Sequence, residues 1–206
     1  FYRYQPDVPG QLLAGGALQA LKIVGAEFFK VNTRSGFLDL RGEPLPVEWV
    51  NIDEVDPATD SVRLEAQSKG AAIFSRGEGI WYGNGLVYFC CSDGGDARAG
   101  QIWAYDPQAE TVTLVVESVT RDVLDAPDNI PVGPDGRLYM YEDGGSGNHI
   151  VGVNSRGELF RVAENVLGSS EFAGGCFSHN GRFMFANIQN PGLTLVIEGP
   201  WRKGQP

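Results

Sequence analysis

The sequence has few of the residues on which several common kinds of protein depend. Cysteine occurs only three times in 206 residues, at Cys90, Cys91 and Cys176, which is too few for a disulfide framework. No stretch approaches the roughly 20 consecutive apolar residues of a membrane-spanning helix. No basic segment followed by an apolar one opens the chain, as a signal peptide would. These shortages argue against a disulfide-stabilised scaffold and against a membrane span.

Basic residues are also scarce relative to acidic ones. Lysine and arginine number 16 and aspartate and glutamate 26, which gives a formal net charge of -10. Because a chain this acidic repels the phosphate backbone of nucleic acids, we expect no nucleic-acid partner. A Gly-x-Ser-x-Gly nucleophile elbow and a Gly-x-x-x-x-Gly-Lys phosphate loop are both missing, which weakens serine-hydrolase and P-loop interpretations.

Glycine, by contrast, is abundant, and it punctuates a repeat. The 28 glycines and 12 prolines suit many short strands joined by tight turns. Three segments align without gaps, and each has two short apolar strands around a turn of the Asn-Gly or Asp-Gly type. The segments are 78–93, 129–143 and 174–189, and the turns are Asn84-Gly85, Asp135-Gly136 and Asn180-Gly181.

Two more strands follow in each of the first two repeats. They are predicted at 101–105 and 111–116, around Asp106-Pro107, and at 150–153 and 158–162, around Arg156-Gly157. Four antiparallel strands per unit, at a spacing of about 45 residues, are typical of β-propeller blades. We therefore predict an all-β fold, a β-propeller with four-stranded antiparallel blades. A sandwich of unrelated hairpins is the alternative.

The repeat does not extend over the whole chain. Residues 1–68 form an irregular opening part, with strands predicted at 1–4, 18–23 and 47–52, and residues 70–201 hold the repeated blades. A ring needs at least four blades, so we expect an incomplete propeller, part of a larger ring, within one domain spanning 1–206. Exposed strand edges would then favour self-association or pairing with a missing N-terminal segment.

Propeller geometry gathers polar residues at one mouth of the central channel. Residues just before the first strand of a blade and just after its second strand lie on the same face of the ring. The first set consists of Glu78, Asp128, Asn129 and Glu171, and the second of Cys91, Asp93, Glu142, Asp143, Asn187 and Gln189. Carboxylates held close together raise one another's pKa unless a cation lies among them.

These oxygen ligands favour a hard cation such as calcium, magnesium, manganese or ferric iron. We expect Glu78 and Glu142 to be metal ligands, because glutamate is a poor turn residue, whereas Asp93 and Asp143 suit turns. Arg76 lies two residues before Glu78 and could either bind an anionic substrate or pair with Glu78.

Several motifs, in the same order, resemble the PhoX-type alkaline phosphatases, a bacterial propeller family. The matching segments are Phe74-Ser-Arg-Gly-Glu-Gly-Ile-Trp-Tyr, Gly100-Gln-Ile-Trp-Ala-Tyr-Asp-Pro, Leu124-Asp-Ala-Pro-Asp-Asn-Ile, Tyr141-Glu-Asp-Gly, Glu171-Phe-Ala-Gly-Gly-Cys-Phe-Ser and Asn187-Ile-Gln-Asn-Pro-Gly-Leu-Thr-Leu-Val-Ile-Glu-Gly-Pro-Trp. They cover residues 70–201, and the earlier part matches more loosely.

The resemblance implies a metal-dependent phosphatase, a phosphomonoester hydrolase with a calcium- and iron-containing cluster, in a periplasmic or secreted protein. On the matched motifs Glu78 and Glu142 are the catalytic metal ligands, with Asp128 and Glu171 as further ligands. We assign substrate binding to Arg76 and Asn129. The family's enzymes are longer, their N-terminal portion contributes ligands including a cysteine, and no basic residue precedes Glu142 here to hold phosphate.

Two other functions fit the same residues. Gluconolactonase-like propellers hold one divalent cation with Glu, Asn and Asp at the channel mouth, and Glu78 followed by Asn129 would suit such a lactonase. A non-catalytic propeller could instead keep a metal for stability and bind a partner. Phosphate release from p-nitrophenyl phosphate, acid release from lactones, or metal content without either activity would separate the three functions.

Overall fold

The computed structural model describes residues 1–26, 29–32, 40–145, 147–154 and 156–201. Apart from two short helices, η1 (Leu12–Ala14) and α1 (Val62–Ser68), the regular elements of these ranges are strands. They are β1 (Tyr2–Pro6), β2 (Gly16–Ile23), β3 (Pro44–Asn51), β4 (Gly77–Gly83), β5 (Leu86–Cys91), β6 (Gln101–Asp106), β7 (Thr111–Glu117), β8 (Pro127–Asn129), β9 (Tyr139–Glu142), β10 (His149–Val153), β11 (Leu159–Glu164), β12 (Phe172–Phe177), β13 (Phe183–Ile188) and β14 (Leu193–Glu198).

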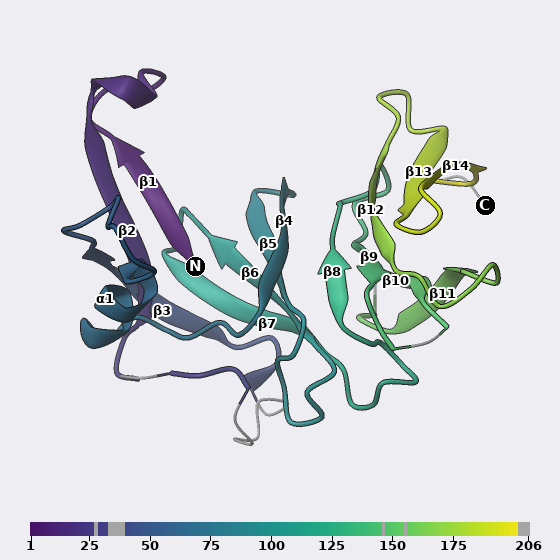
Figure 1. Cartoon of the computed structure of the whole chain (residues 1–206), viewed down its shortest axis with the longest axis horizontal. Coiled ribbons are helices and arrows are strands. Elements are labelled where there is room, and N and C mark those ends of the chain that lie inside the picture. The colour runs from purple at the N-terminus through teal and green to yellow at the C-terminus, as the bar shows by residue number, and fades with distance from the viewer. Residues whose placement is uncertain (27–28, 33–39, 146, 155, 202–206) are drawn as a thin grey trace.

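The strands form three sheets, which follow one another along an arc (Figure 1). Strands β4 to β7 form the first blade, β8 to β11 the second and β12 to β14 the third, and all pair antiparallel in chain order. The first strands of the blades are neighbours in space, because β4 contacts β8 and β8 contacts β12. The all-β propeller prediction is confirmed, although the third blade has three strands in the described part of the chain.

The blades are held together by apolar side chains between their faces. The cluster between the first and second blades is built from alternate residues of β5 and β6 against β9 and β10. A second cluster joins the second and third blades, around Tyr139, Tyr141 and Phe172. Because successive strand residues point to opposite faces, Met140 packs toward the first blade while its neighbours pack toward the third.

The opening part continues the first blade. Strand β3 pairs antiparallel with β7, so that β1, β2 and β3 extend the first blade into one seven-stranded sheet. Their inner face shares a core with the blade, in which Leu21, Trp103 and Leu114 are fully buried. Helix α1, which the sequence analysis did not predict, buries Ala66 against Ala20 and Ile52. Residues 27–28 and 33–39 of the opening part lie outside the described residues.

The three predicted turns differ in geometry. Asn84 and Gly85 have φ of 55° and 82°, as a two-residue hairpin turn requires, and they join β4 directly to β5. The other two turns are wider: Gly133 N–H bonds to Arg137 O at 2.8 Å, and Ser178 N–H bonds to Phe183 O at 2.9 Å. In the part of the chain that the structure covers, no helix is long and apolar enough to cross a membrane.

Candidate functional site

Four carboxylates from three blades gather at one end of the first strands. Glu78 lies at the start of β4, Asp128 lies in β8, and Glu171 directly precedes β12. Asp143 directly follows β9. The charges of Glu78 and Asp143 act on Asp128, and the charges of all three act on Glu171, so we call these four side chains the acidic cluster.

Proximity changes the acidity of two members. The hydrogen bond with Asp143 is the largest cause of the raised pKa of Glu171, about 7, and burial and the charges of Asp143, Asp128 and Glu78 raise it further. Burial is the largest cause of the raised pKa of Asp128, followed by the charge of Glu78. A hydrogen bond between two carboxyl groups requires one of them to hold a proton. The cluster therefore retains protons in a range where isolated carboxyl groups are ionised.

The two residues assigned to substrate lie beside the cluster. The guanidinium of Arg76 is half-exposed, with Nη2 3.7 Å from Glu78 Oε1, and its charge opposes the rise in the pKa of Asp128. Its backbone has a φ of 49°, unusual for a residue with a side chain, and Ser92 N–H donates to its carbonyl at 3.0 Å. Asn129 instead accepts a bond from Gly175 N–H at 3.4 Å, between β8 and β12.

Glu142, which the sequence grouped with these carboxylates, is engaged by the protein. Its side chain is buried, with the residue 3% exposed, and both oxygens accept hydrogen bonds from the protein. Oε1 accepts from Asp125 N–H at 2.9 Å, and Oε2 accepts from His149 N–H at 2.8 Å. His149 Nδ1 also lies 3.0 Å from Oε2. Two backbone amides thus donate to the carboxylate of Glu142, and its assignment as a metal ligand stays a prediction.

Asp143, which was assigned to a turn, is a member of the acidic cluster. The reason is the alternation of β9: Met140 and Glu142 point toward the first blade, and Tyr141 points toward the third. The next residue on the third-blade side is Asp143, which reaches Glu171. Counting strand parity from the apolar pattern of residues 139–142 would have identified Asp143 from the sequence.

Other candidates lie outside the cluster. Asp93 pairs with Arg98 at 2.7 Å, and although burial acts to raise its pKa, hydrogen bonds from Ser75, Arg98 and Asn32 lower it. Burial raises the pKa of both Cys90 and Cys91, so neither thiol is predisposed to ionise.

Comparison of this chain with known proteins identifies its family. The sequence model described as alkaline phosphatase PhoX matches residues 1–192. The chain belongs to the alkaline phosphatase PhoX family. No curated protein matches the chain. Among solved structures it is similar to the crystal structure of selenomethionine-substituted virginiamycin B lyase from Staphylococcus aureus, with 15% identity, a TM-score of 0.39, and coverage of 63% of this chain and 43% of the lyase chain.

In this PhoX-family chain, the acidic cluster brings together oxygen donors without a fixed metal geometry. No three His, Cys, Asp or Glu side chains among the described residues are arranged as a metal site. The donor chemistry nevertheless fits a hard cation, because carboxylates that share protons can exchange those protons for a metal ion. Arg76 adds one cationic group beside the carboxylates, suited to a phosphate oxygen.

Proposed function

We propose that this chain carries part of the active site of a metal-dependent phosphomonoester hydrolase of the PhoX type. The observation that supports it is the gathering of Glu78, Asp128, Asp143 and Glu171 at one end of the first strands, in a chain of the PhoX family. Such a concentration of negative charge does not attract a phosphate ester by itself. It becomes useful to a phosphatase when cations neutralise it.

The acidic cluster would supply the ligands. Calcium and ferric iron, expected from the family resemblance, both prefer carboxylate oxygens, and bound cations supply charge that stabilises the phosphoryl oxygens during hydrolysis. Glu171, whose pKa is raised to about 7 first by its hydrogen bond with Asp143, would give up its proton to bind a cation, since ligation requires the ionised form. Export to the periplasm or the medium, also expected from the family, is part of this proposal.

Two residues of the chain would act on the substrate. The exposed guanidinium of Arg76 has donors that can bind two phosphate oxygens at once, and its pairing with Glu78 is long enough, at 3.7 Å, to be exchanged for substrate. The side chain of Asn129 has its Oδ1 on Gly175 N–H, which directs the amide from β8 toward β12. Asn129 would therefore orient a substrate hydroxyl or ester oxygen with its free donor.

The experiment is phosphate release from p-nitrophenyl phosphate, with calcium and ferric iron supplied. We expect weak, metal-dependent release that falls by at least about tenfold in Glu78→Gln and in Glu171→Gln, because each change removes an anionic ligand at constant size. Bound metal, measured by mass spectrometry, should fall in parallel. The matched control is Glu117→Gln, a buried carboxylate in the first blade, which should retain metal and activity. Acid release from lactones without phosphate release would contradict the proposal and favour a lactonase.

A further inference from the structure

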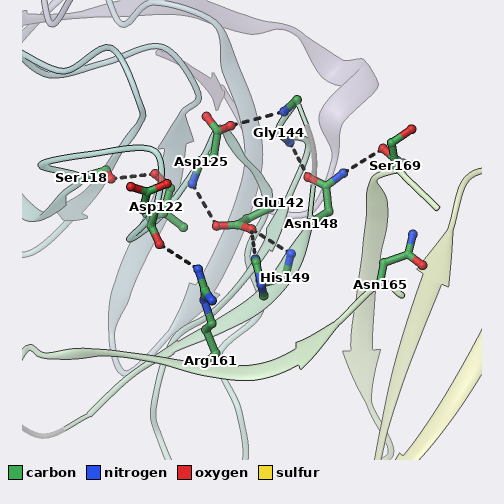
Figure 2. Close-up of polar contacts among 12 residues, drawn as sticks. Ser118, Asp122, Asp125, Glu142, Gly144, Asn148, His149, Arg161, Asn165 and Ser169 are labelled. Atoms are coloured by element: carbon green, nitrogen blue, oxygen red, sulfur yellow. Dashed lines mark hydrogen bonds and ion pairs between the residues drawn. The ribbon is translucent and has the colours of Figure 1, made fainter. Parts of the chain in front are cut away.

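Polar groups surround Glu142, and Glu142, Asn148 and His149 among them are buried (Figure 2). Figure 2 shows its carboxylate between the backbone of Asp125 on one side and His149 on the other. A buried carboxylate is costly unless its oxygens are satisfied, and a backbone N–H donates to each oxygen of this one. The ring nitrogen Nδ1 of His149 lies 3.0 Å from the same Oε2 that accepts the His149 backbone N–H.

Each donor belongs to a segment that carries a member of the cluster. Asp125 lies three residues before Asp128, and its amide is the one held by Glu142. His149 opens β10, and Asp143 directly follows β9. Asp143 N–H also bonds to Ala126 O at 3.0 Å, which joins the same two segments a second time. Glu142 therefore links the segment that carries Asp128 to the segment that carries Asp143.

Asn148 makes the corresponding connection to the third carboxylate. Its Oδ1 accepts from Gly144 N–H at 2.6 Å, and its Nδ2 donates to Ser169 O at 3.2 Å, two residues before Glu171. Asn165 Nδ2 donates to Ser170 O at 2.7 Å. Figure 2 shows Asn148 between Gly144 and Ser169, so one side chain spans the loop after β9 and the segment before β12.

We propose that Glu142 and Asn148 are positioning residues, which hold the segments bearing Asp128, Asp143 and Glu171 at the separation that cation binding requires. This inference rests on the proposed function where it is tested by Ca²⁺ binding. The chain that follows β9 needs such contacts to hold it in place. Gly144 and Gly145 give the chain after Asp143 little intrinsic stiffness, and the negative charge of Asp143 opposes ionisation of Glu171.

The first blade offers a matched control. Glu117 is buried like Glu142, with the residue 5% exposed, and it also accepts two bonds, from Gln101 Nε2 at 2.6 Å and from Asp96 N–H at 3.2 Å. The loop that Glu117 holds carries no member of the acidic cluster. Substituting Glu117 therefore reproduces the loss of a buried carboxylate without disturbing the segments of the cluster.

The experiment is calorimetric titration with Ca²⁺ alone, on the full chain and on three variants. We expect Glu142→Gln and Asn148→Ala each to weaken Ca²⁺ binding by about tenfold or more, and Glu117→Gln to leave it within about twofold, even if the thermal midpoints fall equally. Weakening in Glu142→Gln but not in Asn148→Ala would make Glu142 a ligand and overturn the proposal. Equal weakening in Glu117→Gln would reduce the effect to lost stability, which also overturns it.

Amide hydrogen exchange provides a readout without metal. Exchange of the Asp125, Gly144 and Gly145 amides should accelerate in Glu142→Gln and not in Glu117→Gln, because only the first variant releases their segments. If the unmodified chain bound no Ca²⁺, the proposed function would be wrong. The difference in amide exchange would still test whether Glu142 positions these segments. Unchanged exchange in Glu142→Gln would overturn that role.

Discussion

At the scale of single residues, Glu171 shows how the acidic cluster makes the stability of the fold depend on pH. Its pKa is raised to about 7, first by the hydrogen bond with Asp143, whereas the unfolded chain would give it the ordinary value of 4.5. The folded chain therefore binds more protons than the unfolded chain between these two values. By linkage, the contribution of Glu171 to stability is fully present below pH 4.5 and is lost as the pH rises through 7.

This sign gives a pH prediction. The thermal midpoint of the metal-free chain should decrease as the pH is raised from 5 to 8. In Glu171→Gln, whose side chain cannot ionise, this decrease should be smaller. Other groups also titrate, so the comparison between the two proteins carries the test. Differential scanning calorimetry in chelator-treated buffer measures it. An identical pH profile for both proteins would show that Glu171 is not coupled to Asp143.

The sequence predicted part of the site and missed part of it, for a physical reason. Glu78, Asp128 and Glu171 were placed together because each precedes or opens a first strand, and the structure brings these three together. Glu142 and Asp143 are adjacent, and only strand parity decides which one faces the third blade. Composition and turn propensity carry no information on parity, so Asp143 was assigned to a turn.

At the scale of elements, the close approach of the first strands depends on glycine. A Cβ at Gly79 of β4 would lie 2.6 Å from Asp128 O and 2.7 Å from Asn129 Cα, both of them backbone atoms. Backbone cannot swing aside as a flexible side chain can. Strand β8, which carries Asp128, can therefore lie against β4 only because residue 79 has no side chain.

Gly79→Ala should thus be destabilising. Forcing a methyl group against β8 costs about 1–3 kcal/mol, and a loss of that size lowers the thermal midpoint of a chain this long by roughly 2–10 °C. Gly77→Ala in the same strand is the control, because its Cβ would have no atom within 4 Å. Thermal denaturation followed by circular dichroism measures both. Equal midpoints for the two variants would mean that β4 and β8 do not touch at Gly79.

Element prediction succeeded where local chemistry sets the structure. The Asn84-Gly85 turn and the alternating strands around it follow from φ preference and side-chain alternation, which are local properties. The pairing of β3 with β7 was not predictable in the same way, because it joins residues more than 60 positions apart and no turn fixes its register. Helix α1 is short and held by tertiary contacts around Ala66, so its sequence pattern is weak.

At the scale of the whole molecule, the proposed metal site depends on all three blades. The acidic cluster takes Glu78 from the first blade, Asp128 and Asp143 from the second, and Glu171 from the third. The apolar clusters between blades, around Cys90 and Met140 on one side and Tyr141 and Phe172 on the other, keep these strands in register. A cation bound among the carboxylates would therefore join all three blades and stabilise the folded chain.

The most direct test of the central claim is calorimetric titration of the metal-free chain with Ca²⁺ at pH 6, in two buffers that differ in ionisation enthalpy. At this pH Glu171, with a pKa of about 7, is mostly protonated, so a cation that enters the cluster must displace its proton. The account predicts Ca²⁺ binding with release of about one proton, and loss of that release in Glu171→Gln. The absence of Ca²⁺ binding, or binding that releases no proton, would contradict the claim that the acidic cluster is a metal site.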